Sequence, residues 1–437
     1  MNAAPIVWLI NPPIEDFSAS DHFSRPAGLL RVAAELRSAG CRLEMVDCLQ
    51  PDSRSKQHAW REYINIPIAK PEVFKNIPRY YHHYGLTWER IDALLASLPA
   101  PRLVLVGAGM TYWYSSVKQV IARVRLLHPS APIALGGIYP TLAPDHASTV
   151  SGADIVVAGV AGDTFRRWAT SHLDGLEIKP TGDPPAWDLL DHQGGMAVNT
   201  SRGCPHGCGY CGAKLSPRRI EVPLSRIFDE LTALHERFGG TSVAIYDDEL
   251  ALGGGSHFKH FLQGVAKLPV RFQWHLPNAV NAASLDPELA ILMKDCGFTQ
   301  PRLSLPHMDR RMGPQGLDTT ALRHMQLAAS AFQAAGYAPG VLSFYLVTGL
   351  PDQRLGWVLR AAQQLADLGI KSYQSQFSPI PGTPLGDRRL AQLNYQESKE
   401  LLLTNKALSV YRHPNWTADE YSSFILSLRR LRDSIRP

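Results

Sequence analysis

The chain has 437 residues, of which 45 % are hydrophobic and 19 % are charged. This length predicts two or three domains, and the composition is typical of a soluble protein with a substantial core, which excludes disordered and collagen-like classes. The net charge of +5, from 44 basic and 39 acidic residues, is too small and too scattered to indicate a nucleic-acid partner. Six cysteines are too few for a disulfide framework and favour a reducing compartment.

The sequence gives no sign of a membrane segment. No apolar run approaches the roughly 20 residues that a membrane-spanning helix needs, so no membrane partner is expected. The apolar N-terminus has no basic region before it and is cut short by Asn11-Pro12-Pro13, which indicates a first strand instead of a signal peptide. We therefore expect a cytoplasmic protein.

Strand and helix patterns alternate over the first 180 residues. Short apolar runs that end in turn residues predict buried strands at residues 6–10, 43–46, 103–107, 133–137 and 154–157. Helical patterns lie at residues 26–40 and 115–127. This alternation predicts a doubly wound, Rossmann-like α/β domain over residues 1–180, with ligands at the carboxyl ends of its strands.

Residues 49–101 interrupt this alternation and are rich in aromatic and basic residues, among them Trp60, Tyr63 and Tyr80–Tyr84. Two interpretations stay open: an insertion that caps a ligand face, or a helical excursion on the surface. After the first domain, three prolines and a glycine between Lys179 and Pro185 predict a linker.

Six strand patterns alternate with helical patterns after the linker. The strands are expected at residues 196–200, 242–246, 272–276, 302–305, 341–347 and 371–377. The helices are expected at residues 224–238, 258–267, 286–296, 319–335 and 357–368. This pattern predicts a partial (β/α)6 TIM-like barrel over residues 186–389, with its sites on the loops that follow the strands. Residues 390–437 are expected to form a short helical C-terminal extension.

Three of the six cysteines, Cys204, Cys208 and Cys211, follow the first barrel strand in a C-x3-C-x2-C spacing. Glycines around them let the chain curl so that the thiolates converge. Soft thiolates select zinc or an iron–sulfur cluster. A structural zinc site needs four ligands and clusters are normally held by four cysteines, so three cysteines leave one iron for a non-protein ligand. A zinc loop with His206 as fourth ligand and simple buried cysteines stay open as alternatives.

The cysteine motif resembles that of the radical S-adenosylmethionine (SAM) superfamily, including the aromatic residue Tyr210 before the last cysteine. The resemblance implies that Cys204, Cys208 and Cys211 hold a [4Fe–4S] cluster whose fourth iron binds SAM. It further implies an electron donor such as flavodoxin or ferredoxin, cleavage of SAM to a 5′-deoxyadenosyl radical, and a small-molecule substrate. Cys41, Cys48 and Cys296 are expected to be small buried hydrophobic residues.

An N-terminal α/β domain joined to such a barrel resembles the cobalamin-binding subclass of this superfamily. The resemblance implies a cobalamin-binding-type domain over residues 1–180, with Gly136 and Gly137 beside the cofactor's tail. Tyr112 and Trp113 either stack on the corrin ring or fill a domain interface. The histidine-bearing D-x-H-x-x-G motif of methionine-synthase-like domains is absent, which equally permits a domain that no longer binds cobalamin.

Polar and backbone groups at the barrel strand ends are the remaining candidates. One of Asp247, Asp248 and Glu249 is expected to meet the ammonium or a ribose hydroxyl of SAM, unless these residues cap the next helix, and the sequence does not distinguish among the three. The other expected cofactor contacts are Asn278, Ser304, Gly349, Leu350 and Pro351. His307 is the candidate catalytic residue, as a proton donor or substrate contact, with a packed histidine as the alternative.

The resemblance to this subclass implies a radical SAM enzyme that methylates an unactivated carbon or phosphorus centre, with methylcobalamin as methyl donor. One alternative uses the adenosyl radical for rearrangement, ring formation or sulfur transfer, with an N-terminal domain that binds cobalamin non-catalytically or not at all. An alternative of another class is a corrinoid or metal-binding carrier protein.

Overall fold

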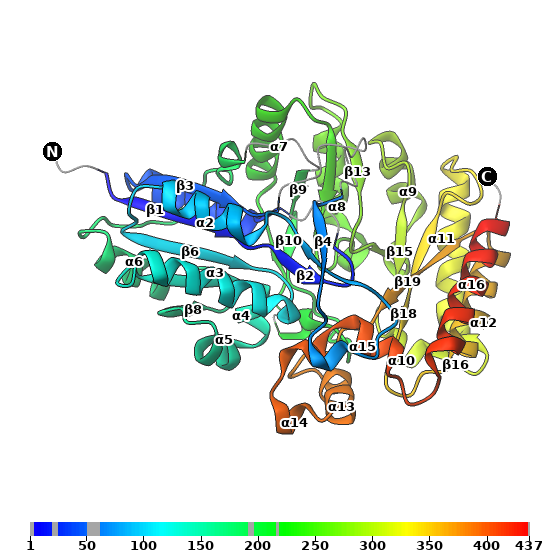
Figure 1. The fold of residues 1–437 in the computed structure, drawn as a ribbon. Helices are drawn as coiled ribbons and strands as arrows, with labels where there is room; N and C mark the ends of the chain where they lie inside the picture. The colour runs from blue at the N-terminus through cyan, green and yellow to red at the C-terminus, as the bar shows by residue number, and fades with distance from the viewer. Residues whose placement is uncertain (1–3, 20–24, 50–61, 191–195, 216–217, 436–437) are drawn as a thin grey trace. The chain divides into compact units, whose positions relative to one another are not determined.

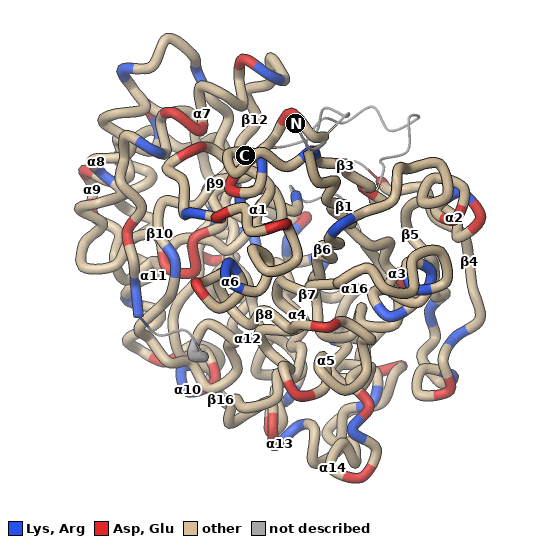
Figure 2. Tube along the Cα trace, turned by 90° about the vertical axis from the view of Figure 1, so that its left-hand side faces the viewer, with Lys and Arg blue, Asp and Glu red and all other residues tan. Residues whose placement is uncertain are grey.

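In a computed structural model, the described residues are 4–19, 25–49, 62–190, 196–215 and 218–435. The chain divides into two compact units (Figure 1): unit 1 comprises residues 1–195 with 229–240, and unit 2 comprises residues 196–228 with 241–437. Acidic and basic residues are interspersed along both units (Figure 2), in keeping with the low net charge. Among the described residues, no helix has the length and apolar character needed to cross a membrane.

Unit 1 is built on a five-stranded parallel sheet in the order β3-β1-β6-β7-β8. Its strands are β1 (Ile6–Asn11), β3 (Arg42–Asp47), β6 (Leu103–Ala108), β7 (Ile133–Gly137) and β8 (Ile155–Val157). Numbered along this sheet alone, the order is 2-1-3-4-5, which is a doubly wound order with its topological switch point between β1 and β6. The predicted strands and the α/β class are confirmed.

Helices cover both faces of this sheet. They are α1 (Ala27–Ser38), α2 (Trp88–Ser97), α3 (Tyr114–Leu127), α4 (Ile138–Leu142), α5 (Pro144–Val150) and α6 (Asp163–His172). One core cluster joins Val7 and Leu105 of the sheet to Leu36 of α1 and Phe165 of α6. The intervening Trp8 is fully buried as well, so β1 has no solvent-exposed face and reads as a continuous apolar run.

The described part of the insertion contributes two strands to a second, antiparallel sheet. The order of this sheet is β2-β5-β4, with β2 (Ile14–Asp16) from outside the insertion and β5 (Tyr81–Tyr84) and β4 (Asn65–Ile68) from within it. The helical excursion considered from the sequence accounts only for α2, because aromatic residues such as the tyrosines of β5 favour a strand over a helix. Trp60 lies outside the described residues.

Unit 2 carries two parallel sheets. The first has the order β13-β12-β9, with β9 (Met196–Val198), β12 (Ser242–Ile245) and β13 (Gln273–His275). The second has the order β14-β15-β18-β19, with β14 (Val280–Asn281), β15 (Arg302–Ser304), β18 (Ser343–Thr348) and β19 (Lys371–Gln376). The sequence predicts every strand of these two parallel sheets except the two-residue β14. The described residues show no ladder between β13 and β14, so a single continuous barrel wall stays a prediction.

Helices alternate with these strands along the chain, within two residues of the predicted ends. They are α7 (Leu224–Phe238), whose residues from 229 on belong to unit 1, and α8 (Ser256–Val265), α9 (Pro287–Asp295), α11 (Thr319–Ala334) and α12 (Leu355–Asp367) of unit 2. Shorter elements are α10 (Met308–Arg311) and the antiparallel pair β16 (Met312–Gly313) and β17 (Gly316–Leu317).

The C-terminal region is helical, as expected. Its helices are α13 (Pro384–Gln392), α14 (Tyr395–Ser398), α15 (Lys406–Tyr411) and α16 (Ala418–Ser434). A capping box of Thr417 and Glu420 starts α16. Tyr421 on this helix exchanges hydrogen bonds with Gln374 and Gln376 of β19, the last strand of its sheet. The helix thereby gives an edge strand polar partners within the chain.

Candidate metal centre

The cysteine segment begins where β9 ends, at the carboxyl edge of the first sheet of unit 2. Its first residues form β10 (Ser201–Arg202), which pairs with β11 (Ile220–Glu221) in an antiparallel ribbon. Gly203 and Gly207 have φ angles of +81° and +64°, so the chain turns through left-handed backbone before and after Cys204. The three thiols of Cys204, Cys208 and Cys211 are half-buried and unbridged.

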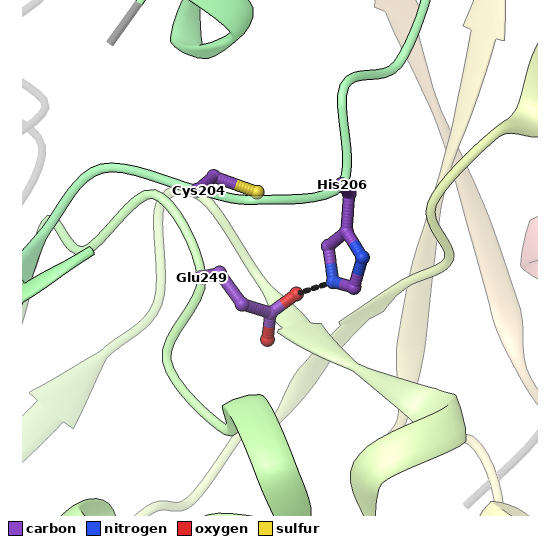
Figure 3. A group of neighbouring side chains, drawn as sticks. All are labelled: Cys204, His206 and Glu249. Carbon is purple, nitrogen blue, oxygen red and sulfur yellow. Dashed lines mark hydrogen bonds and ion pairs between the residues drawn. The ribbon is translucent and has the colours of Figure 1, made fainter. Parts of the chain in front are cut away.

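Three consecutive acidic residues after β12 bind this segment at three successive points. The buried Asp247 carboxylate accepts hydrogen bonds from the Thr200 amide at 2.7 Å and from the Thr200 and Ser201 hydroxyls, both at 2.6 Å. Asp248 accepts a hydrogen bond from the Gly203 amide at 2.8 Å. Glu249 accepts one from Nε2 of His206 at 2.7 Å (Figure 3). The acids therefore fix the chain immediately before Cys204 and between Cys204 and Cys208.

The loop after β15 binds the same segment from the second sheet. The backbone amide of His307 donates a hydrogen bond to Sγ of Cys208 at 3.2 Å. His307 has a φ of +58° and a ψ of +36°, a left-handed conformation that few residues other than glycine adopt. At the start of α13, the Leu385 amide donates to the Gly209 carbonyl at 2.9 Å. The cysteine segment is thus held by residues from three separate parts of unit 2.

Burial of the cluster candidates raises their pKa values. Burial is the main cause that raises the pKa of the Cys204 thiol to about 11; Glu249, Cys211 and Cys208 act in the same direction, and a hydrogen bond from the His206 amide opposes them. Burial also raises the pKa of Cys208, against the hydrogen bond from the His307 amide. A metal centre binds the deprotonated sulfurs and would therefore displace these protons. Three soft sulfur donors suit the [4Fe–4S] cluster that the sequence predicts.

A second donor set overlaps the first. Sγ of Cys204, a ring nitrogen of His206 and a carboxylate oxygen of Glu249 all lie within 4.8 Å of one another (Figure 3). One sulfur, one nitrogen and one oxygen donor with an open fourth position also suit zinc. Nδ2 of Asn281 donates to Oε2 of Glu249 at 3.4 Å and helps to orient this carboxylate.

Several predicted cofactor contacts of unit 2 have partners within the chain. Both oxygens of Asp247 are engaged by Thr200 and Ser201, and burial raises the pKa of this carboxyl against those hydrogen bonds. Nδ2 of Asn278 donates to the carbonyls of Tyr246 and Asp247, each at 3.2 Å. Ser304 ends β15 and is half-buried. Contacts of these residues with SAM stay predictions.

The structure also shows the surroundings of Tyr210 and His307, the aromatic and polar candidates beside the cysteines. Tyr210 is largely buried, and burial holds the pKa of its phenol far above the ordinary value. The rings of His307 and His206 lie 6.4 Å apart between centroids. Nδ1 of His307 is buried and has no hydrogen-bond partner among the described residues. Nδ1 is thus a polar atom that a bound group would satisfy, and the catalytic role predicted for His307 stays a proposal.

The loop Gly349-Leu350-Pro351 depends on residues that the sequence analysis missed. Gly349 has a φ of +105° and donates its amide to Oε1 of Gln353 at 2.8 Å. The Leu350 carbonyl accepts a hydrogen bond from Nε2 of His413 at 2.9 Å. His413 comes from the C-terminal region and stacks on Trp416. No local signal reveals this pairing, because the partners lie 63 residues apart.

The candidates in unit 1 are engaged within that unit. Tyr112 is buried, and Nε1 of Trp113 donates to Oδ2 of Asp16 at 3.1 Å. Gly137 has a φ of +115°, and a Cβ added there would lie 2.2 Å from the Ala108 carbonyl oxygen. Its missing side chain is therefore required by the neighbouring strand. A Cβ at Gly136 would meet only Val157, at 3.9 Å.

Comparison with known proteins adds two findings. Residues 198–376, from β9 to β19, match the family model of the radical SAM superfamily. A protein of Synechocystis sp. (strain ATCC 27184 / PCC 6803 / Kazusa), named as an uncharacterized methyltransferase, is similar at 29 % identity over 188 residues. The similarity covers 38 % of this chain and 34 % of that protein, so the chain matches about a third of its relative's length.

Replacing Cys208 tests which donor set holds the metal: the three cysteines, or Cys204 with His206 and Glu249. We expect Cys208→Ala to lose the cluster, because a thiolate ligand is removed, and His206→Gln to keep it, because the three thiols remain. Iron and sulfide analysis after anaerobic reconstitution, with the absorbance of the reconstituted protein, measures both. If Cys208→Ala kept its metal and His206→Gln lost it, the ion would belong to Cys204, His206 and Glu249 instead.

Replacing Asp247 tests the hydrogen bonds that hold the cysteine segment. Asp247→Asn replaces one acceptor oxygen with an NH2 group that faces either the Thr200 amide or the two hydroxyls, and it removes the charge from the remaining hydrogen bonds. We therefore expect the free energy of unfolding to fall by about 2–3 kcal/mol. We also expect less iron per chain after reconstitution. Denaturant titration of the cluster-free protein measures the first effect. Asp229→Asn, at an exposed position of α7, is the matched control and should leave both quantities unchanged; an equally stable Asp247→Asn would contradict the assignment.

His413 predicts a loss of stability in acid. Nδ1 accepts the Asn415 amide and Nε2 donates to Leu350, so a second ring proton has no acceptor. Burial is the main cause that lowers the pKa of His413 from 6.5 to about 4; Arg389 acts in the same direction, and the hydrogen bond to Leu350 and the charge of Asp352 oppose the shift. Because the folded pKa is depressed, this contribution is present above pH 6.5 and lost as the pH falls toward 4, by roughly 3 kcal/mol.

Urea titrations between these two pH values measure the effect of His413. The pKa of His275 is also lowered to about 4 by burial, so His413→Phe should remove about half of the pH dependence and leave the rest. An unchanged pH dependence in this variant would show that His413 is not the titrating group.

Proposed function

We propose that the chain, whose residues 198–376 match the radical SAM superfamily model, cleaves S-adenosylmethionine reductively at a [4Fe–4S] cluster held by Cys204, Cys208 and Cys211. The observation that carries this proposal is that three half-buried thiols lie on one short segment, which hydrogen bonds to Asp247, Asp248 and Glu249 hold. A flavodoxin or ferredoxin is the class of partner that would supply the electron.

The chain's own residues prepare this site before any ligand arrives. The bound cluster supplies one electron to SAM, which yields methionine and a 5′-deoxyadenosyl radical. The His307 amide donates to the Cys208 sulfur, and such hydrogen bonds stabilise negative charge on a thiolate ligand. Because the amide is fixed by a left-handed backbone at His307, the interaction is in place without reorganisation.

Backbone and polar groups at the carboxyl ends of the strands are the proposed contacts for SAM. Asp248 uses one carboxylate oxygen for the Gly203 amide, which leaves the other for an ammonium or ribose hydroxyl. The loop of Gly349, Leu350 and Pro351 is fixed by Gln353 and His413 and is proposed to meet the adenine. The His307 side chain, with its unpartnered Nδ1, is the proposed proton donor or substrate contact.

Methyl transfer to a carbon or phosphorus centre of a small molecule is the reaction class we propose. The support is the methyltransferase name of the Synechocystis protein. Rearrangement, ring formation or sulfur transfer by the adenosyl radical is the alternative. The described residues at the switch point of unit 1 bond to one another, Trp113 to Asp16 and Ser115 to Glu15, so we propose no cobalamin there.

Cleavage of SAM tests the proposal directly. The reconstituted protein, with dithionite as reductant and without oxygen, should release 5′-deoxyadenosine from SAM, and Cys208→Ala should release none. Liquid chromatography with mass detection measures the product. SAM carrying a deuterated methyl group then distinguishes methyl transfer, which moves the label out of SAM, from the other radical reactions, which leave it in methionine. Undiminished cleavage by Cys208→Ala would overturn the proposed cluster ligands.

A further inference from the structure

The switch point of unit 1 is where a doubly wound sheet places its ligand. The loops that follow β1 and β6 leave in opposite directions there, which opens the space that cofactors use in such folds. In this chain the loop after β1 does not open such a space. Two prolines follow β1, and the chain then enters β2 (Ile14–Asp16), which pairs with β5 of the insertion.

The first residues that close the switch point are Asp16 and Trp113. Asp16 comes from β2 after the first strand, and Trp113 comes from the loop after β6. The Trp113 indole donates to Oδ2 of Asp16 at 3.1 Å, and the Phe17 amide donates to Oδ1 at 2.7 Å. Asp16 is fully buried. A hydrogen bond within the chain therefore joins the two loops that a bound cofactor would separate.

A carboxylate of the chain lies at the N-terminal turn of α3, the helix that follows β6. Helix N-termini in this position attract phosphates and other anions of ligands. Here Oε2 of Glu15 accepts from the Ser115 hydroxyl, and Oε1 accepts from the Gln119 side chain, each at 3.3 Å. Ser115 and Gln119 both belong to α3. Glu15 thus gives this helix end the negative charge that a cofactor would otherwise bring.

Apolar side chains of the insertion complete the closure. Ile14, Leu49, Tyr63 and Tyr84 form one buried cluster, and Trp113 packs against it. Beside this cluster, the Leu86 amide donates to the Cys48 carbonyl at 2.8 Å, immediately after β3. The ends of β3, β1 and β6 are therefore all bonded to the insertion or to β2.

We infer that β2 and the described part of the insertion (residues 49 and 62–101) permanently occupy the switch point, so that unit 1 takes no cobalamin there and the radical chemistry of unit 2 proceeds without it. The second clause rests on the proposed function; the first does not. Of the two interpretations of the insertion, this one favours a cap on a ligand face, with the cap lying where the ligand would bind. Gly137 and Trp113, expected to serve cobalamin, have roles within the unit: Gly137 makes room for the Ala108 carbonyl, and Trp113 donates to Asp16.

Corrin retention by the full-length, cluster-reconstituted protein tests the inference. We expect incubation with hydroxocobalamin or methylcobalamin, followed by anaerobic gel filtration, to leave no corrin absorbance with the protein. We also expect the rate of 5′-deoxyadenosine release to be the same with and without added cobalamin. About one corrin per chain after filtration, or cleavage that needs cobalamin, would overturn the inference. Failure of the proposed function is distinct, because no 5′-deoxyadenosine would form under either condition.

Substitutions in the closure give a readout that does not depend on cobalamin. Trp113→Phe removes the donor to Asp16, and Asp16→Asn replaces its charged acceptor, so each should lower the melting temperature of the protein. Tyr80→Phe is the matched control, since this ring is 80 % exposed, and it should leave the melting temperature unchanged. Unaltered melting temperatures for both Trp113→Phe and Asp16→Asn would show that the closure is not a fixed part of unit 1 and would contradict the inference.

Discussion

The candidate metal centre depends on three hydrogen-bonding contacts between two strand ends. Asp247, Asp248 and Glu249 follow β12, and each binds a different point of the segment that follows β9. The two strands are parallel neighbours, with Ala244 opposite Ala197, so both segments start from one edge of the sheet. A glycine-rich segment loses much conformational freedom when it is ordered, and buried charge-assisted hydrogen bonds offset that cost. The thiols consequently have defined positions before any metal binds.

The surroundings of the thiols favour their protonated form when no metal is bound. Burial is the main cause of the raised pKa of Cys204, and Glu249 acts in the same direction. A cationic centre that binds the sulfurs would reverse this preference by stabilising the deprotonated form. The His307 amide supplies the one opposing dipole that points at a sulfur from another sheet. Binding of the metal centre therefore links β9, β12 and β15, which would couple loading of the site to the order of unit 2.

The sequence predicts the elements of this protein better than their contacts. Periodicity locates nearly all long strands and helices, because burial on one or two faces leaves a local pattern, and the cysteine spacing with its glycines locates the metal centre. Local patterns do not reveal β14, which has two residues, or the antiparallel sheet of the insertion, whose register depends on β2. They also miss His413 and Asn281, since a histidine or asparagine acquires its role only from distant partners.

The acidic residues show why residue type alone underdetermines function. Asp247 and Asp16 both follow a parallel strand, where ligands of α/β proteins bind, and both are buried. Each is nevertheless satisfied by donors of the chain itself, the hydroxyls of Thr200 and Ser201 in one case and the Trp113 indole in the other. A buried carboxylate must be hydrogen-bonded, and internal donors meet that need as well as a ligand does. In unit 2 these internal hydrogen bonds leave the neighbouring thiols open to a cofactor. In unit 1 they close the place where a cofactor would bind.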